Sequence, residues 1–178
     1  TSNAQLGNIL KKVKKVADAV SGKDNTTTQT ATADGVKETT LANGVTMQNP
    51  LSGVVDFELV GVYAKSTSLN YGYAYVVLKV KMIANKSSIV LGGGINGSSA
   101  LAVDQDGNAY KMSTNGLTKS VTEGIAVKIA LNEKEACFLD VKKTAKTFQV
   151  LRLGVYVNAS NLGMLTFKNV PIQWDVEP

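Results

Sequence analysis

The sequence contains no histidine and only one cysteine, Cys137. Without histidine the chain lacks the usual general base and the commonest metal ligand, and one cysteine cannot form an internal disulfide. A catalytic thiolate would also need an activating base, which histidine is not there to supply. Cys137 lies in the strand-like stretch "EACFLDV", so we interpret it as a small buried residue of the core. The sequence therefore predicts no catalytic residue, no metal site and no cofactor.

Prolines, aromatic side chains and long hydrophobic runs are also scarce. The chain of 178 residues has three prolines and 6% aromatic residues, but 16 glycines. No apolar run approaches the roughly 18 residues that a membrane-spanning helix needs. Hydrophobic residues make up 44% of the chain, which is enough for one good core. Frequent valine, threonine and asparagine favour short strands and many turns, so we expect an all-β domain.

Positive charge is concentrated at the start of the chain. The formal net charge is +5, but residues 1–23 hold five lysines and one aspartate, so the remaining chain is close to +1. A nearly neutral body lacks the basic stripe that neutralises phosphates. We therefore expect no nucleic acid partner for the main domain.

Residues 1–22 are predicted to form a short basic amphipathic helix. Apolar residues from Leu6 to Val20 recur at the i, i+3, i+4 and i+7 spacing of one helix face. Such a helix could lie on an anionic membrane through four lysines, Lys11, Lys12, Lys14 and Lys15. It has no aromatic anchor, however, so we prefer docking of its apolar face on its own domain or on a second copy, which would give a homodimer.

Residues 23–43 are predicted to be a threonine-rich linker. Residues 21–43 contain seven threonines and hardly any large apolar side chain, so burial would not offset the entropy of ordering them.

At the start of the chain, Ser2 and Ala4 are small residues spaced as at a signal-peptidase site, with a cloning remnant as the alternative. We expect an exported protein, periplasmic or extracellular.

Residues 44–178 consist of segments in which apolar and polar residues alternate, as in half-buried strands. The turn "DQDGN" is expected to close a hairpin in which Asp104 caps the backbone. A change of alternation between Lys168 and Val170 predicts a bulge. Seven to nine strands without helical crossovers predict an antiparallel β-sandwich. In the stretch "VVDFELVGVY", one face is expected to hold Val55, Phe57, Leu59 and Tyr63, opposite Asp56 and Glu58.

Three motifs suggest chemistry that the rest of the chain does not support. Aligning Gly107 with the invariant glycine of a calcium loop puts Ala102 and Ser113 where carboxylates are needed. The stretch "LGGGINGSS" lacks the Gly-Lys-Ser/Thr ending of a phosphate-binding loop, so we expect a sharp connection between strands. Outward acids on alternate positions could serve a hydrolase, but they are also typical of solvated strands. The two such pairs are Asp56 with Glu58, and Glu133 with Glu135.

The stretch "YGYAYVVLKVK" predicts a strand with one unusual face. Lysines mark the outward side, which also holds Tyr71, Tyr73, Tyr75 and Lys79. Three neighbouring tyrosines would expose enough apolar surface to indicate a contact. We predict that this strip either binds an external protein or glycan or is covered by the N-terminal helix, the linker or the glycine-rich loop. Pairing with Tyr156 across strands is the remaining alternative.

A resemblance to a known family rests on the stretches "YVVLKVKMIANKSS", "LAVDQDGNAY", "FLDVKK" and "LRLGVYV". Together they resemble the immunoglobulin-like domains of unknown function in exported bacterial proteins and lipoproteins of the Bacteroidetes type. The likeness covers roughly residues 52–175. It implies an immunoglobulin-like β-sandwich in a cell-envelope setting and no catalytic residues. We therefore expect a non-catalytic binding or assembly module whose partner is a protein or glycan of the envelope. A peripheral membrane-surface adaptor is the alternative, and a carboxylate-dependent hydrolase the least favoured.

Overall fold

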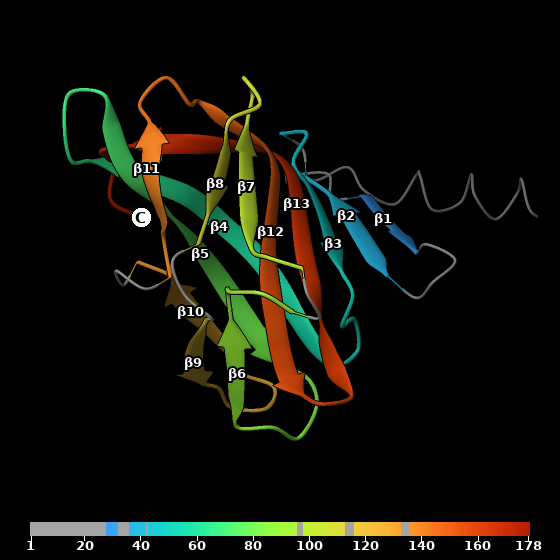
Figure 1. Ribbon diagram of the computed structural model, residues 1–178. Helices are drawn as coiled ribbons and strands as arrows, with labels where there is room; N and C mark the ends of the chain where they lie inside the picture. Colours follow the sequence, from blue (N-terminus) through green and yellow to red (C-terminus); the bar gives the residue numbers. More distant parts are fainter. Residues whose placement is uncertain (1–27, 32–35, 42, 96–97, 113–115, 133–135) are drawn as a thin grey trace, which may run out of the picture.

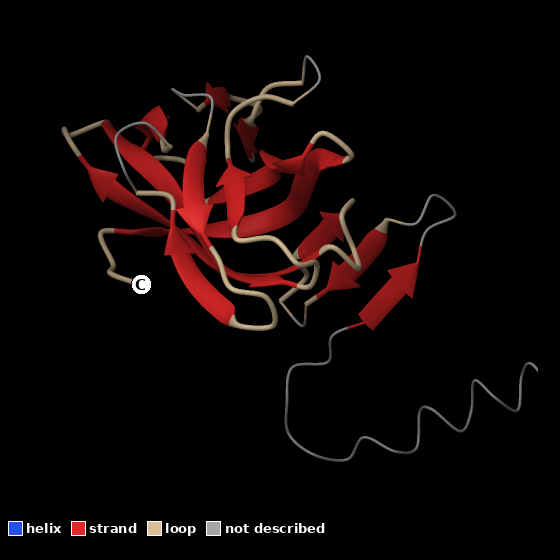
Figure 2. Cartoon of the chain, turned by 90° about the horizontal axis from the view of Figure 1, so that it is seen from below, coloured by secondary structure: helices blue, strands red, loops and turns tan. Residues whose placement is uncertain are grey.

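The structure is a computed structural model that describes residues 28–31, 36–41, 43–95, 98–112, 116–132 and 136–178. Every regular element in these ranges is a strand, as Figures 1 and 2 show, so the predicted all-β class is confirmed. Within the same ranges, no helix has the length and hydropathy that crossing a membrane requires. The helix predicted for residues 1–22 lies outside the described residues.

The described residues form thirteen strands, more than the seven to nine expected. The strands are β1 (Thr28–Ala31), β2 (Lys37–Thr40), β3 (Thr46–Asn49), β4 (Val55–Ser66), β5 (Tyr71–Met82), β6 (Ser88–Leu91), β7 (Leu101–Asp104), β8 (Ala109–Lys111), β9 (Leu117–Ser120), β10 (Ala126–Ala130), β11 (Phe138–Lys142), β12 (Thr147–Asn158) and β13 (Asn161–Trp174).

The strands belong to two sections that β13 joins. In the first, which we call the β12 sheet, the path β1-β2-β3-β13-β12 continues along two branches, through β6 to β9 and through β7 to β8. In the second, the β5 sheet, β10 and β11 both pair with one side of β5, and β4 pairs with the other. The end of β13 pairs in parallel with β4, through Ile172–Trp174 and Val62–Ala64. The expectation of a purely antiparallel sandwich is therefore wrong at this junction, because β13 passes from one sheet into the other.

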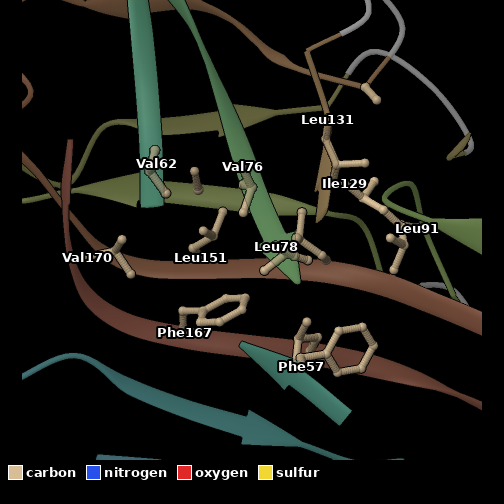
Figure 3. Close-up of a cluster of buried hydrophobic side chains, with 14 of the residues drawn as sticks. Phe57, Val62, Val76, Leu78, Leu91, Ile129, Leu131, Leu151, Phe167 and Val170 are labelled. Atoms are coloured by element: carbon tan, nitrogen blue, oxygen red, sulfur yellow. The ribbon is translucent and has the colours of Figure 1, made fainter. Parts of the chain in front are cut away.

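One hydrophobic core fills the space between the two sheets. Figure 3 shows Val62, Val76 and Leu78 of the β5 sheet beside Leu151 and Phe167 of the β12 sheet. All five side chains are fully buried. Truncating one of the buried phenylalanines to alanine typically costs about 3–5 kcal/mol, so this core dominates stability. The arrangement is sandwich-like, in agreement with the alternating pattern of the sequence.

Two irregularities reverse the alternation along long strands. The register between β4 and β5 shifts between Leu59 and Gly61, so the strand bulges at Val60. Beyond the bulge Val62 points into the main core and Tyr63 to the opposite face. The expectation that Tyr63 shares a face with Phe57 is therefore wrong, because one extra residue reverses the alternation. The change of alternation predicted between Lys168 and Val170 is confirmed, because the buried residues pass from Leu165 and Phe167 to Val170 and Ile172. Asn169 has a left-handed φ of 58° at this point, but β13 keeps the same register with β12 on both sides of it, so the predicted bulge is not found there.

The segment predicted to be a linker contains two strands. β1 pairs with β2, and β2 pairs with β3, both antiparallel. Figure 1 shows β1 and β2 extending sideways from β3, away from the other strands. The prediction of an unstructured linker is wrong for Lys37–Thr40, because β3 supplies a ready edge to which threonine, with its high β propensity, can add.

Candidate functional site

A groove of about 410 Å³ opens where β2 and β3 diverge from β4. Four apolar side chains form the floor of the groove. Leu41 and Met47 come from one side, and Phe57 and Leu59 come from β4 on the other side. Volumes in this range are typical of ligand sites. The lining also includes polar and charged side chains and one alanine, namely Lys37, Thr39, Asn49, Asp56, Glu58, Lys79, Lys81 and Ala126.

The first part of β4 is an open edge that faces this groove. The Val55 carbonyl points away from β5, because it accepts a 2.8 Å hydrogen bond from Asn49 Nδ2. The Val55 N–H also points away from β5, toward the carbonyl of Leu51 at 3.0 Å. Backbone groups alternate sides along an antiparallel strand, so the N–H and C=O groups of Phe57 and Leu59 point the same way. On the side of β4 that faces away from β5, no strand among the described residues pairs with Phe57 or Leu59.

The rim of the groove is charged but only partly paired. Lys79 Nζ lies 3.0 Å from Glu58 Oε1, across the pairing of β4 with β5. Lys81 stands opposite Asp56 in the same register. The described residues form only one other ion pair, which lies outside the groove, so neither Lys37 nor Lys81 has an ion-pair partner there. The lining holds three lysines and two acids, so the groove carries a small net positive charge above an apolar floor.

The predicted tyrosine strip is divided between exposed and buried positions. Tyr71 is 44% exposed and Tyr73 is half-buried, whereas Tyr75 is only 2% exposed. Tyr75 packs between Tyr63 and Tyr73, with ring centroids 5.9 and 6.2 Å apart. The pairing suggested with Tyr156 is wrong, because that residue belongs to β12 in the other sheet and the cross-strand partner of Tyr75 is Tyr63. The last member of the strip, Lys79, lies at the groove instead.

Tyr75 belongs to a second, small hydrophobic cluster on the outer face of the β5 sheet. The other buried members are Tyr63, Val77 and Cys137. Burial raises the pKa of the Tyr75 hydroxyl, and burial likewise raises the pKa of the Cys137 thiol. The interpretation of Cys137 as a buried core residue is confirmed, although it belongs to this outer cluster and not to the main core.

Several predicted site residues are not brought together. Lys11, Lys12, Lys14 and Lys15 lie outside the described residues, as do Glu133 and Glu135. Asp56 and Glu58 stand on the rim of the groove, where Glu58 is occupied by Lys79. In the part of the chain that the structure describes, no cluster of three or more Cys, Asp or Glu residues could hold a metal ion.

A second hollow lies at the opposite end of β5. It is lined by Leu69, which is 88% exposed, by Tyr71 and by lysines at the end of β11 and in the turn that follows it. Two of these lysines are engaged locally, because Lys142 Nζ donates to Asn108 and Lys146 Nζ donates to the Lys143 carbonyl. This hollow is shallow and has no apolar floor comparable to that of the groove.

Sequence reasoning missed most of the groove. The sequence predicts a linker at Leu41 and a strand face for Phe57, but the pattern does not show that the sheets diverge beside these residues. No sequence signal marks the site, because the alternation of apolar and polar residues does not reveal the bulge at Val60, and β4 pairs with β13 only beyond that bulge.

Comparisons with known proteins give no relative: no protein-family description, curated protein or solved structure matches this chain.

Proposed function

We propose that the chain is a non-catalytic binding or assembly module that holds its ligand in the groove between β2, β3 and β4. The observation that carries the proposal is an accessible apolar floor under a charged rim. Apolar floors with a few polar groups at the margin are typical of binding sites, because burial supplies affinity and the polar groups fix orientation.

The chemistry of the rim also supports binding. Among the acids that could serve a hydrolase, Asp56 and Glu58 belong to one strand, and Glu58 is held by a lysine. The thiol of Cys137 is buried in an apolar cluster away from the groove. An immunoglobulin-like relationship and an exported, cell-envelope setting, as expected from the sequence, form part of the same proposal.

The groove can be tested with an apolar anionic dye, 1-anilinonaphthalene-8-sulfonate, which suits both the floor and the unpaired lysines. Ala126 is an exposed residue of β10 that lines the groove, so Ala126→Phe should obstruct it. Ala109 is also an exposed strand residue, in β8, and provides the matched control, Ala109→Phe. We expect dye affinity to fall about tenfold in the first variant, equivalent to about 1.4 kcal/mol, and to stay unchanged in the second. Equal affinities in both variants would remove the groove as the binding site.

A further inference from the structure

We propose that the occupant of the groove is an extended segment of a partner protein, which adds to β4 as a further strand of the β5 sheet. This inference rests on the proposed binding role of the groove and names the class of ligand. It is carried by the open backbone of Phe57 and Leu59 beside the apolar floor.

The geometry of the edge matches a polypeptide better than a small molecule. Phe57 and Leu59 each present one N–H and one C=O to the groove, and residues two apart on a strand lie about 6.8 Å apart. This repeat of donor and acceptor is the one that an extended backbone presents. Binding by strand addition uses such edges, with main-chain hydrogen bonds for affinity and alternate side-chain pockets for specificity.

The open stretch has defined ends, which limits the length of the segment. At one end, Asn49 and Leu51 already occupy the backbone groups of Val55. At the other end, β13 begins to pair with β4 at Val62. The free edge between them accepts a paired stretch of about five residues, or roughly 17 Å at the usual rise along a strand.

The walls of the groove indicate the composition of the segment. Alternate side chains of an added strand would turn inward, toward Leu41, Met47 and Phe57, and should be apolar. Lys37 and Lys81 have no ion-pair partner among the described residues, so the segment should also carry an acidic side chain. Residues 1–22 of the chain itself carry four lysines and one aspartate, so this segment is basic and does not match the acidic segment expected in the groove.

The test begins with displayed random decapeptides selected against the full-length protein. The enriched peptide is synthesised, and each backbone nitrogen is methylated in turn before affinity is measured by calorimetry. Methylation removes a donor, so we expect a loss of roughly 2- to 12-fold or more at every second position and little change between them. Equal tolerance of methylation at all positions would overturn strand addition.

Variants of the protein test the same hydrogen bonds from the other side. Leu59→Pro removes an N–H that faces the groove. Because this N–H points away from β5, its loss breaks no hydrogen bond between β4 and β5. Proline is tolerated at such positions on the edge of a sheet. Leu59→Ala removes the same side chain and keeps the N–H. The proline variant should bind the peptide at least roughly twofold more weakly than the alanine variant. Equal affinities would contradict a bond from Leu59.

The remaining outcomes separate the two proposals. Peptide binding that is unchanged in both Leu59→Pro and Leu59→Ala would place the peptide elsewhere and overturn this inference, whereas the dye experiment would still decide the groove itself. Dye binding in the groove without any enriched peptide would overturn the inference alone.

A free protein that sediments as a dimer and dissociates on adding the peptide would assign the edge to a second copy. Enriched peptides that share the apolar spacing of residues 5–20 would assign it to the chain's own N-terminus. Either result would overturn an external partner.

Discussion

The hydroxyl of Tyr110 donates a 2.7 Å hydrogen bond to Oδ2 of Asp104, a carboxylate with no exposed surface. Oδ1 accepts from the backbone N–H groups of Asp106 and Asn108, both at 2.9 Å. Asp104 thus caps the turn between β7 and β8, as predicted, while Gly107 takes the left-handed φ of 84° that the turn needs. Burial, followed by the bond to Asp104, raises the pKa of Tyr110 to about 12.

Asp104→Asn should destabilise the protein at neutral pH. Burial alone would raise the pKa of Asp104, but its bonds from Tyr110, Asn108 and Asp106 outweigh burial and lower it. An amide keeps one acceptor oxygen and turns an NH₂ group toward donors, so we expect a loss of about 2–3 kcal/mol at pH 7 in urea unfolding. The exposed neighbour offers a control, because Asp106→Asn should change stability by less than about 0.5 kcal/mol.

The same variant predicts a pH dependence with a definite sign. Because the pKa of Asp104 is lower in the folded state, its contribution is present above the unfolded value of about 3.9 and is lost as the pH falls through the folded value. The difference between wild type and Asp104→Asn should therefore shrink below about pH 4. A difference that stays constant from pH 7 to pH 2 would contradict this account.

The turn at Asp104 could be predicted from sequence because all of its parts are within seven residues of each other. The same is true of one face of β5, where alternation predicts the buried residues from Gly72 to Met82 at every second position. The prediction is wrong for Tyr75 and Val77, which belong to the other face and are buried as well. The prediction failed at Tyr63, because the alternation of apolar and polar residues does not show whether the strand contains one bulged residue before that position. It also failed at the groove, since an open edge depends on which distant strand does not pair with β4.

Tyr75→Ala should be far more damaging than Tyr71→Ala. Tyr75 is buried between two other tyrosine rings, so its truncation should cost about 3–5 kcal/mol, as for other large aromatic residues. Tyr71 is 44% exposed and should cost less than about 1 kcal/mol. Thermal and urea unfolding of both variants would measure the difference. Similar losses would mean that the strip is one surface, as the sequence suggested.

Cys137 should react slowly in the folded protein. The thiol is 2% exposed and burial raises its pKa, so both access and thiolate content are reduced. We expect labelling by a disulfide reagent at pH 8 to be slower than in the unfolded chain by on the order of a hundredfold or more. The control is the same protein in 6 M guanidinium chloride, a concentration of about twice what small domains usually need to unfold. Comparable rates in both states would show that the outer cluster opens readily.

Asn49→Ala should loosen the end of the open edge of β4. The Asn49 side chain is 2% exposed, donates to the Val55 carbonyl at 2.8 Å and accepts from the Leu51 N–H at 2.9 Å. Its removal leaves two backbone groups without these partners, so we expect a loss of about 1–3 kcal/mol in urea unfolding. Hydrogen exchange should also become faster at Leu51. Asn85, an exposed asparagine, supplies the control variant Asn85→Ala, and equal stability of the two variants would contradict a role for Asn49 in fixing this edge.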